Sequence, residues 1–318
     1  MKQVLLWAGC IGMLLSACIG GKKGDAEAEN AEVSKPVNLG IMATMDGLPF
    51  VIAQKLGMYD SLGVTVNLIR FDSSNDRDAA LQSGQIDGAI TDYPSVIVLQ
   101  AHRTPMAIIM KNNSYLCFVV SPSSNINHFR QLQGKNIAIS RNTVVEYATD
   151  LLLKKNGILF TAVNMPEIGQ IPIRLQMMQY GQVDASFLPD PSATLAMKSG
   201  YRSLISTREL GIEMTGTAFT QKALNKKSKE IKLLVDGYNR AVAYVQTRPL
   251  EAWKPLLMEE IGVPEIAAGL LVLPAYEQAT RASVQEIDKA IAWLKEKGRI
   301  SPNFQGTNLV DTTFITLK

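Results

Sequence analysis

The sequence predicts an α/β fold with two similar lobes and a ligand cleft between them. Two observations predict this fold. Apolar segments of strand length alternate with segments of helical periodicity, which is typical of sheets with mostly parallel pairing. In addition, "GQIDGAITDYPS" from Gly84 is nearly repeated as "GQVDASFLPDPS" from Gly181, 97 positions later. A repeat of this spacing is one domain long, whereas solenoid units span roughly 20–50 residues.

The first half of the chain supplies the elements of one lobe. Strands are predicted over residues 37–44, 64–71, 86–91 and 106–110. Helices are predicted over 49–59 and 72–84, and a third helix begins at Pro94. Pro49 suits the first turn of its helix, Ser and Asp side chains can cap the second helix, and Gly84 can end it.

The pattern then restarts and later becomes mainly helical. Strands are predicted over 136–140 and 183–188, and helices over 144–157, 173–181 and 191–200. After about Thr215, long helical segments follow over 229–247, 250–262 and 283–298. Ser283 and Glu286 have the spacing of a capping box at the start of the last helix. Cys117, in the apolar segment "YLCFVVS", is expected to be a core residue rather than a catalytic thiol.

The N-terminal segment predicts export and a lipid anchor. Lys2 precedes an apolar stretch that is too short to span a membrane, and "LSAC" ends at Cys18. This pattern resembles a bacterial lipobox, so residues 1–17 are interpreted as a signal peptide and Cys18 as the lipidated residue. The alternative is an ordinary signal peptide cut near Ala17. Residues 18–36 lack large apolar side chains and are expected to form a flexible tether.

Composition limits the class of function. The chain has 318 residues, enough for two domains, and a net charge of only +3. Because the basic residues are scattered, no nucleic-acid partner is expected. Phosphate-binding glycine motifs and clustered His or Cys ligands are not found in the sequence, so neither a cofactor nor a metal is expected.

The repeated motif also locates the cleft. Ligands of open α/β sheets bind beyond the carboxyl ends of the strands. Polar residues follow the repeated strand in each copy: Thr91, Asp92 and Tyr93 in the first, and Asp190 in the second. Asp190 can also be explained as a helix cap. The paired Asp87 and Asp184 are expected to bind nearby backbone, because they recur at one structural position.

The chain resembles the type-2 periplasmic binding proteins of ABC importers, in the branch for taurine, aliphatic sulfonates, nitrate and thiamine-pyrimidine precursors. The matching segments are "GLPFVIAQKLGMYDSLGVTVNLIRF", "ALQSGQIDGAITD", "FRQLQGKNIAIS", "MQYGQVDASFLPDPSA" and the C-terminal helical region. The resemblance implies a first lobe of residues 37–117 plus 218–318 and a second lobe of 118–217. It also implies crossing strands near 116–121 and 215–220, a hinge that includes Gly216, and C-terminal helices on the first lobe.

The resemblance further implies an extracytoplasmic, membrane-anchored and monomeric binder, which captures a small polar ligand by hinge closure and delivers it to an ABC permease. Ligand contacts are expected in three groups of the first lobe: Thr44, Met45, Asp46, Gly47 and Leu48; Thr91, Asp92 and Tyr93; Asn112 and Ser114. Those of the second lobe are expected at Ser140, Arg141, Asn142, Thr143, Val144, Glu146 and Asp190.

Two other classes of function stay open at this point. Enzymes of menaquinone and thiamine-pyrimidine biosynthesis share the fold, but the only two His residues, His102 and His128, follow no predicted strand end, so we expect no enzyme. A ligand sensor that docks on a signalling receptor is the other class.

The charges of the expected contacts favour one kind of ligand. Asp46, Asp92, Glu146 and Asp190 are opposed only by Arg141. The unfavourable free energy of a desolvated carboxylate next to a bound anion exceeds the favourable interaction of that anion with one helix N-terminus. A neutral or cationic nitrogen compound, such as a pyrimidine precursor, is therefore expected, with a sulfonate, taurine or nitrate as the alternative.

Overall fold

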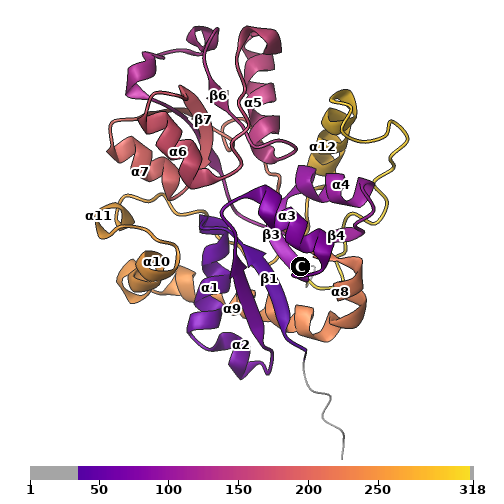
Figure 1. The fold of residues 1–318 in the computed structure, drawn as a ribbon. Helices are drawn as coiled ribbons and strands as arrows, with labels where there is room; N and C mark the ends of the chain where they lie inside the picture. The colour runs from indigo at the N-terminus through magenta and orange to yellow at the C-terminus, as the bar shows by residue number, and fades with distance from the viewer. Residues whose placement is uncertain (1–34, 316–318) are drawn as a thin grey trace, which may run out of the picture. The chain divides into compact units, whose positions relative to one another are not determined.

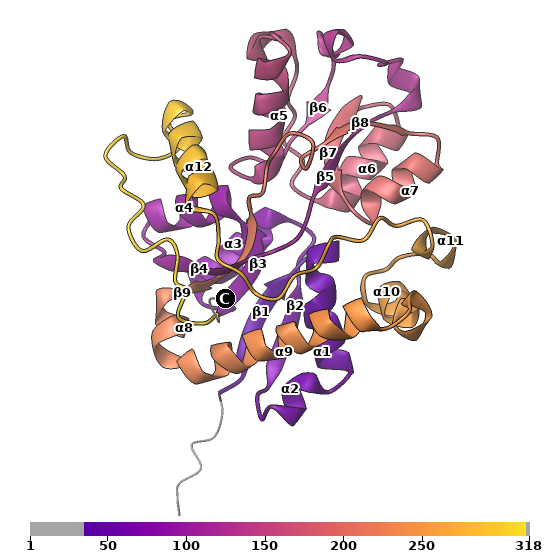
Figure 2. The same ribbon diagram turned by 180° about the vertical axis from the view of Figure 1, so that it is seen from behind.

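The computed structural model describes residues 35–315, which contain two separate β-sheets (Figures 1 and 2). The first sheet has the order β2 (Val66–Arg70), β1 (Val37–Ile41), β3 (Gly88–Asp92), β9 (Thr215–Thr220) and β4 (Met106–Lys111). Strand β1 pairs in parallel with β2 and β3, whereas β9 is antiparallel to β3 and β4.

The second sheet is smaller. Its order is β6 (Ile137–Ala138), β7 (Ala185–Pro189), β5 (Leu116–Val120) and β8 (Arg202–Ser206). Strands β6 and β7 are parallel, and β5 is antiparallel to β7 and β8. The sheets form the two lobes of a mixed α/β fold, which confirms the predicted fold class.

Helices cover both sheets. In the first lobe they are α1 (Leu48–Lys55), α2 (Met58–Ser61), α3 (Ser74–Ser83), α4 (Tyr93–Ala101), α8 (Gln221–Lys226) and α9 (Ser228–Thr247). The second lobe has α5 (Val144–Lys155), α6 (Ile171–Gln179) and α7 (Ser192–Lys198). The C-terminal helices are α10 (Lys254–Glu260), α11 (Glu265–Ala268) and α12 (Val284–Glu296). Short 3-10 helices span Met45–Gly47, Pro122–Ser124, Phe129–Leu132, Phe160–Ala162 and Leu250–Ala252.

Local capping explains where several helices begin and end. The Ser73 hydroxyl accepts from the Asp76 N–H at the start of α3, and Gly84 ends this helix with a φ of 75°. The Ser283 hydroxyl likewise accepts from the Glu286 N–H at the start of α12. These caps confirm the predicted boundaries, because each satisfies backbone groups that a helix end leaves unpaired.

The repeat has the same backbone contact in both lobes. Asp87 accepts from the N–H of Asn38 at 2.7 Å, and Asp184 accepts from the N–H of Asn136 at 2.9 Å. A lysine lies beside each carboxylate: Lys227 is 2.7 Å from Asp87, and Lys135 is 3.8 Å from Asp184. The prediction that both aspartates are structural is confirmed.

The connections between the sheets begin a few residues earlier than predicted. Strand β5 lies wholly in the second sheet and β9 wholly in the first, so residues 112–115 and 207–214 connect the sheets. We therefore propose lobe boundaries within these connections. Gly216 is part of β9, where an added Cβ would lie 2.8 Å from the Met110 carbonyl oxygen. Gly216 thus lies outside the connections between the sheets, and close strand packing accounts for the glycine, so its role as a hinge residue stays a prediction.

The prediction missed β8, α8 and α11. The signal peptide, Cys18 and most of the tether lie outside the described residues. Within the described part of the chain, helices long and apolar enough to cross a membrane are not found.

Candidate functional site

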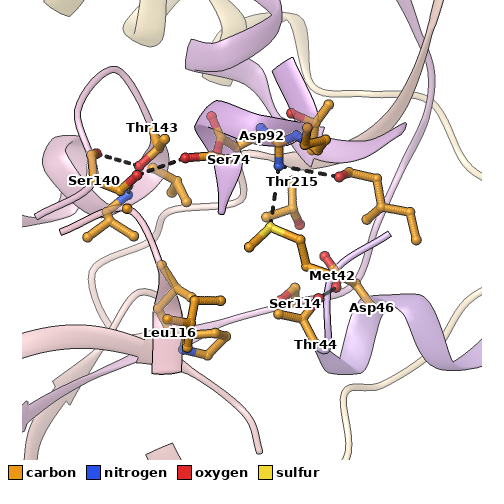
Figure 3. Close-up of a pocket in the computed structure, with 18 of the residues that line it drawn as sticks. Met42, Thr44, Asp46, Ser74, Asp92, Ser114, Leu116, Ser140, Thr143 and Thr215 are labelled. Carbon is orange, nitrogen blue, oxygen red and sulfur yellow. Dashed lines mark hydrogen bonds between the residues drawn. The ribbon is translucent and has the colours of Figure 1, made fainter. Parts of the chain in front are cut away.

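A cavity of about 90 Å³ lies between the two lobes (Figure 3). Residues from both sheets line it, including the loop after β1, the start of α3, the end of β3, the loop before α5 and the start of α6. Its lining comprises Met42, Thr44, Asp46, Ser74, Arg77, Ile90, Thr91, Asp92, Ser114, Leu116, Ser140, Thr143, Val144, Val145, Gly169, Ile171, Arg174, Pro189 and Thr215. The space is large enough for several waters or one small ligand.

Two buried carboxylates of the first lobe face this cavity. Asp46 accepts from the Thr44 hydroxyl at 2.6 Å, and burial raises the pKa of Asp46. Asp92 caps α4 by accepting from the Ser95 N–H at 3.0 Å. Burial raises the pKa of Asp92 to about 6, although the nearby Arg77 favours its ionised form. Both carboxylates therefore bind protons more readily than exposed aspartates do.

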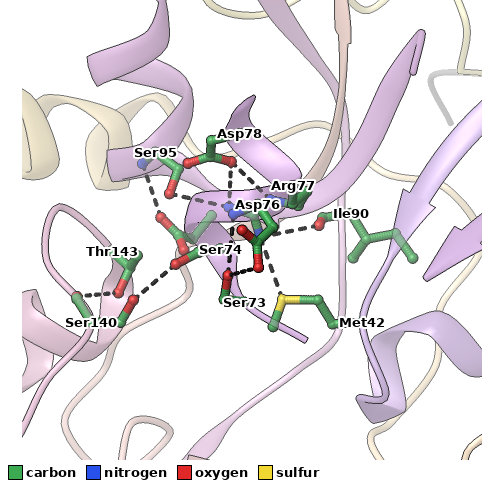
Figure 4. A network of polar contacts seen from close by, with 11 residues as sticks. Met42, Ser73, Ser74, Asp76, Arg77, Asp78, Ile90, Ser95, Ser140 and Thr143 are labelled. Carbon is green, nitrogen blue, oxygen red and sulfur yellow. Dashed lines mark hydrogen bonds and ion pairs between the residues drawn. The ribbon is translucent and has the colours of Figure 1, made fainter. Parts of the chain in front are cut away.

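Arg77 is held in a polar network of its own lobe (Figure 4). Its guanidinium lies 2.8 Å from Asp78 and donates to the Ile90 carbonyl at 3.4 Å. It also donates to the Ser95 hydroxyl at 3.3 Å. Because Asp78 neutralises it, Arg77 contributes little net charge to the cavity.

Arg174 lies on the second-lobe side of the cavity and has no such carboxylate. Its side chain donates to the carbonyl oxygens of Ile168 and Phe187, each at 3.0 Å, and the residue is 2% exposed. Among residues 35–315, no ion pair is found for it. Burial lowers the pKa of Arg174 to about 10, so the guanidinium stays charged at neutral pH. An unpaired buried charge is costly, and a bound anion would offset that cost.

The two arginines occupy equivalent positions of the repeat. Arg77 and Arg174 are 97 positions apart, as are the carbonyls of Ile90 and Phe187 that they contact. The carboxylates are not repeated, because the equivalents of Asp78 and Asp92 are Leu175 and Pro189. The second copy has thus kept the cation and lost its counter-charges.

The lobes touch each other beside the cavity. The hydroxyls of Ser74 and Ser140 are 2.8 Å apart (Figures 3 and 4). The Ile171 N–H donates to the Asp72 carbonyl at 3.3 Å. Ser73 and Gln170, again 97 positions apart, form an isolated antiparallel bridge. The helix starts of the two repeats therefore meet across the cleft.

Eight of the expected contact residues line this cavity. They are Thr44, Asp46, Thr91, Asp92, Ser114, Ser140, Thr143 and Val144. The Thr91 hydroxyl is buried and has no hydrogen-bond partner in the described part of the chain, so it is available to a ligand.

Five other expected contacts lie outside the lining. Met45, Gly47, Leu48 and Tyr93 are buried in the first lobe. Asn112 lines a different cavity, and its side-chain oxygen accepts from the Thr217 hydroxyl at 2.8 Å.

Four expected polar contacts of the second lobe also lie outside the lining, and other groups bind the side chains of three of them. Arg141 is 2.8 Å from Glu167, and Glu146 accepts from the backbone N–H of Asn142 at 2.7 Å. The Asn142 side chain does not line the cavity. Asp190 accepts from the Thr194 N–H at 3.0 Å, so it acts as the helix cap that the alternative interpretation described.

This arrangement corrects the expected charge balance. Glu146, Asp190 and Arg141 leave the set of lining residues, and Arg77 and Arg174 join it. The argument for a neutral or cationic ligand counted side chains that do not line this cavity, so the charge of the ligand stays a prediction. Extending the alignment of the two repeat copies to seven positions before Gly84 and Gly181 would have shown that both copies have an arginine there.

The chain belongs to the NMT1/THI5-like family, whose pattern matches residues 45–252. The nitrate import ATP-binding protein NrtC of Synechococcus elongatus is 25% identical over 247 residues, which cover 74% of this chain. This chain spans about a third of the length of that curated relative, with 32% covered.

Solved structures show the same fold. The periplasmic aliphatic sulphonate binding protein SsuA of Escherichia coli has a TM-score of 0.71 and 17% identity, covering 87% of this chain and 96% of SsuA. The periplasmic nitrate-binding protein NrtA of Synechocystis PCC 6803 has a TM-score of 0.71 and 13% identity, covering 85% and 83% of the two chains. The fold is therefore that of periplasmic binding proteins, as the sequence predicted.

Proposed function

We propose that this protein is an extracytoplasmic solute-binding protein that captures a small anion between its lobes and delivers it to an ABC importer. The proposal is based on one observation above all: Arg174 is a buried, charged guanidinium at the cavity without an ion-pair partner among residues 35–315. A binder needs no catalytic group, and none of the lining residues is a histidine or cysteine.

Other groups of the cavity suit the same ligand. The first turns of α3 and α6 reach the lining at Ser74 and Ile171. A helix N-terminus favours an anion by about 0.3–1 kcal/mol. The unpartnered Thr91 hydroxyl can donate to an oxyanion. The names of the similar proteins, which bind sulfonates or nitrate, agree with this class of ligand.

A thermal-shift panel tests the proposal. The full chain is heated with nitrate, methanesulfonate, taurine or an aminopyrimidine, each at millimolar concentration. A ligand at 100 times its dissociation constant stabilises by about 2.7 kcal/mol, which raises the midpoint by several degrees. We expect a shift with at least one of the anions. A shift with the aminopyrimidine alone would contradict the proposal and restore the nitrogen-compound hypothesis.

Matched arginine variants identify the anion site. Arg174→Met should abolish the shift, whereas Arg141→Met should keep it, because Arg141 is paired with Glu167 outside the lining. The midpoint without ligand shows whether each variant folds, and Arg174→Lys keeps a cation if the methionine variant does not fold. An anion shift that persists unchanged in a folded Arg174→Met variant would place the site elsewhere.

Lipid anchoring at Cys18, hinge closure, a monomeric state and a permease partner complete the proposal. The lipobox-like segment and the family support the first and last of these. A sensor would dock on a receptor in its ligand-bound form. It would therefore differ from the binding protein of an importer in its partner and not in its ligand site. Co-purification with a permease would separate the two roles.

A further inference from the structure

A cluster of charged and aromatic side chains joins α5 of the second lobe to the C-terminal helix α12. Lys297 Nζ lies 2.9 Å from Glu146 Oε1 and 2.9 Å from Asp150 Oδ2. The Trp293 indole N–H donates to the same Asp150 oxygen at 2.9 Å. The Tyr147 ring meets the Trp293 ring edge-on, with centroids 5.4 Å apart. The cluster lies outside the cavity between the lobes.

The cluster connects the two lobes. Helix α12 packs on α4 of the first lobe (Figures 1 and 2), and its residues Ile287, Ala290 and Leu294 are buried. Helix α5 follows β6 of the second sheet. The Glu146 and Asp150 side chains are only 2% and 5% exposed, so Lys297 pairs with two carboxylates that have little water around them.

Glu146 also holds the loop that lines the cavity. Its second oxygen accepts from the Asn142 N–H at 2.7 Å, and Asn142 has a left-handed φ of 59°. Its neighbours Ser140 and Thr143 line the cavity, and Ser140 contacts Ser74 of the first lobe. This loop, residues 140–143, is thus tied to the first lobe directly at Ser140 and indirectly through Glu146 and Lys297.

We propose that Lys297 is a positioning residue, which fixes the loop of residues 140–143 through Glu146 and favours contact between the lobes without touching the ligand. Without Lys297, the contact would leave two neighbouring carboxylates buried, while separation of α5 from α12 would hydrate them. The affinity for a ligand bound between the lobes falls with the fraction of molecules in the competent conformation. The effect on affinity rests on the proposed function; the effect on the loop does not.

Hydrogen exchange of the ligand-free full chain tests the effect on the loop. In Lys297→Met, we expect the segment around Asn142 to exchange about tenfold faster, while β1 keeps its protection. Lys297→Arg should restore slow exchange, because it can pair with both carboxylates. Glu146→Gln should give an intermediate rate, since the amide oxygen can still accept from Asn142 but the ion pair is lost.

Lys289→Met is the matched control. Lys289 pairs with Glu286 at 2.6 Å within α12, so this variant removes an ion pair from the same helix without separating the lobes. Its exchange around Asn142 should equal that of the unsubstituted protein. Two outcomes would overturn the proposal: unchanged exchange around Asn142 in a folded Lys297→Met variant, or equal acceleration in β1, which would indicate a general loss of stability.

Nitrate binding measured by calorimetry tests the effect on affinity. The dissociation constant should rise about tenfold in Lys297→Met and stay unchanged in Lys289→Met. Faster loop exchange with unchanged nitrate affinity would overturn the link to binding. If nitrate does not bind the unsubstituted protein and no other anion in the panel does, the proposed function fails, and the exchange result still decides the role of Lys297.

Discussion

Anion binding should strengthen as the pH falls through about 6, because Asp92 faces the cavity with a raised pKa. Burial sets the pKa of Asp92 at about 6, so about nine in ten of these carboxyls are protonated at pH 5 and only a few per cent at pH 7.5. Burial raises the pKa of Asp46 as well, which adds to the effect in the same direction. Nitrate and methanesulfonate stay ionised throughout this range, so the change belongs to the protein.

The magnitude follows from Coulomb's law. Because the cavity holds only about 90 Å³, a ligand in it lies within roughly 8 Å of the lining carboxylate. At an effective dielectric constant of about 20, two like charges at that distance repel by about 2 kcal/mol, or about thirtyfold in affinity. Screening by solvent reduces this value, so an increase of about tenfold between pH 7.5 and pH 5 is the expected result.

Calorimetric titrations at pH 7.5, 6.5, 5.5 and 5.0 measure this effect, with Asp92→Asn as the control. The asparagine can still cap α4 through its side-chain oxygen, but it carries no charge at any pH. The variant should bind the anion at pH 7.5 about as tightly as the unsubstituted protein does at pH 5. A dissociation constant that is flat with pH, or that rises as the pH falls, would refute the reasoning and indicate a ligand that Asp92 attracts.

The same raised pKa gives the sign of a stability effect. The folded state takes up a proton at about pH 6 and the unfolded state at about pH 4, so Asp92 binds more protons in the folded state between these values. Its contribution to stability therefore increases as the pH falls from above 6 to about 4. Asp92→Asn should be more stable than the unsubstituted protein at pH 7.5, by an amount on the order of 2 kcal/mol, and this advantage should vanish near pH 4.

Three further predictions concern the anchor, the packing and the repeat. Cys18→Ala should move the protein from membranes to the soluble fraction, and retention after a high-salt wash would contradict the lipid anchor. Gly237→Ala should destabilise by about 1–2 kcal/mol in chemical denaturation, since its Cβ would lie 2.3 Å from the Tyr59 ring and outweigh the better helix propensity. Gly269→Ala, with open space around it, is the neutral control. Leu175→Asp places a carboxylate where it can pair with Arg174, as Asp78 pairs with Arg77, and it should weaken anion binding in calorimetry. Unchanged binding in a folded variant would mean that anion binding does not depend on an unpaired Arg174.

The sequence was sufficient for the elements whose signals are local. The boundaries of α3 and α12 could be predicted because Ser73, Gly84 and Ser283 act on neighbouring backbone. The structural role of Asp87 could be predicted because a repeated position needs one explanation for both copies. Strand β8 was missed, since its residues are mostly half-exposed and its partner β5 is distant in sequence.

The candidate site was harder to predict, because burial and pairing decide which side chains reach it. Arg141 lies within the loop of residues 140–143 that lines the cavity, yet its side chain pairs with Glu167 outside the lining. Glu146 lies in the first turn of α5, yet it is directed to Asn142 and Lys297. Such partners are far apart in sequence, so the charge of a residue alone could not show whether it faces the ligand.

The duplication explains why Arg174, unlike Arg77, has no carboxylate beside it among the described residues. Both copies use a buried arginine to bind the carbonyl of their central strand, at Ile90 and Phe187, so the arginine has a structural role that does not require a ligand. In the first copy, Asp78 offsets the cost of burying that charge. In the second copy the corresponding leucine cannot, and the uncompensated charge of Arg174 remains next to the cavity.

A ligand anion would then offset the same cost that Asp78 offsets in the other lobe, but only while the lobes enclose it. We therefore expect ligand binding and lobe closure to be coupled, because water screens the charge when the cleft is open and the anion must replace that water when it closes.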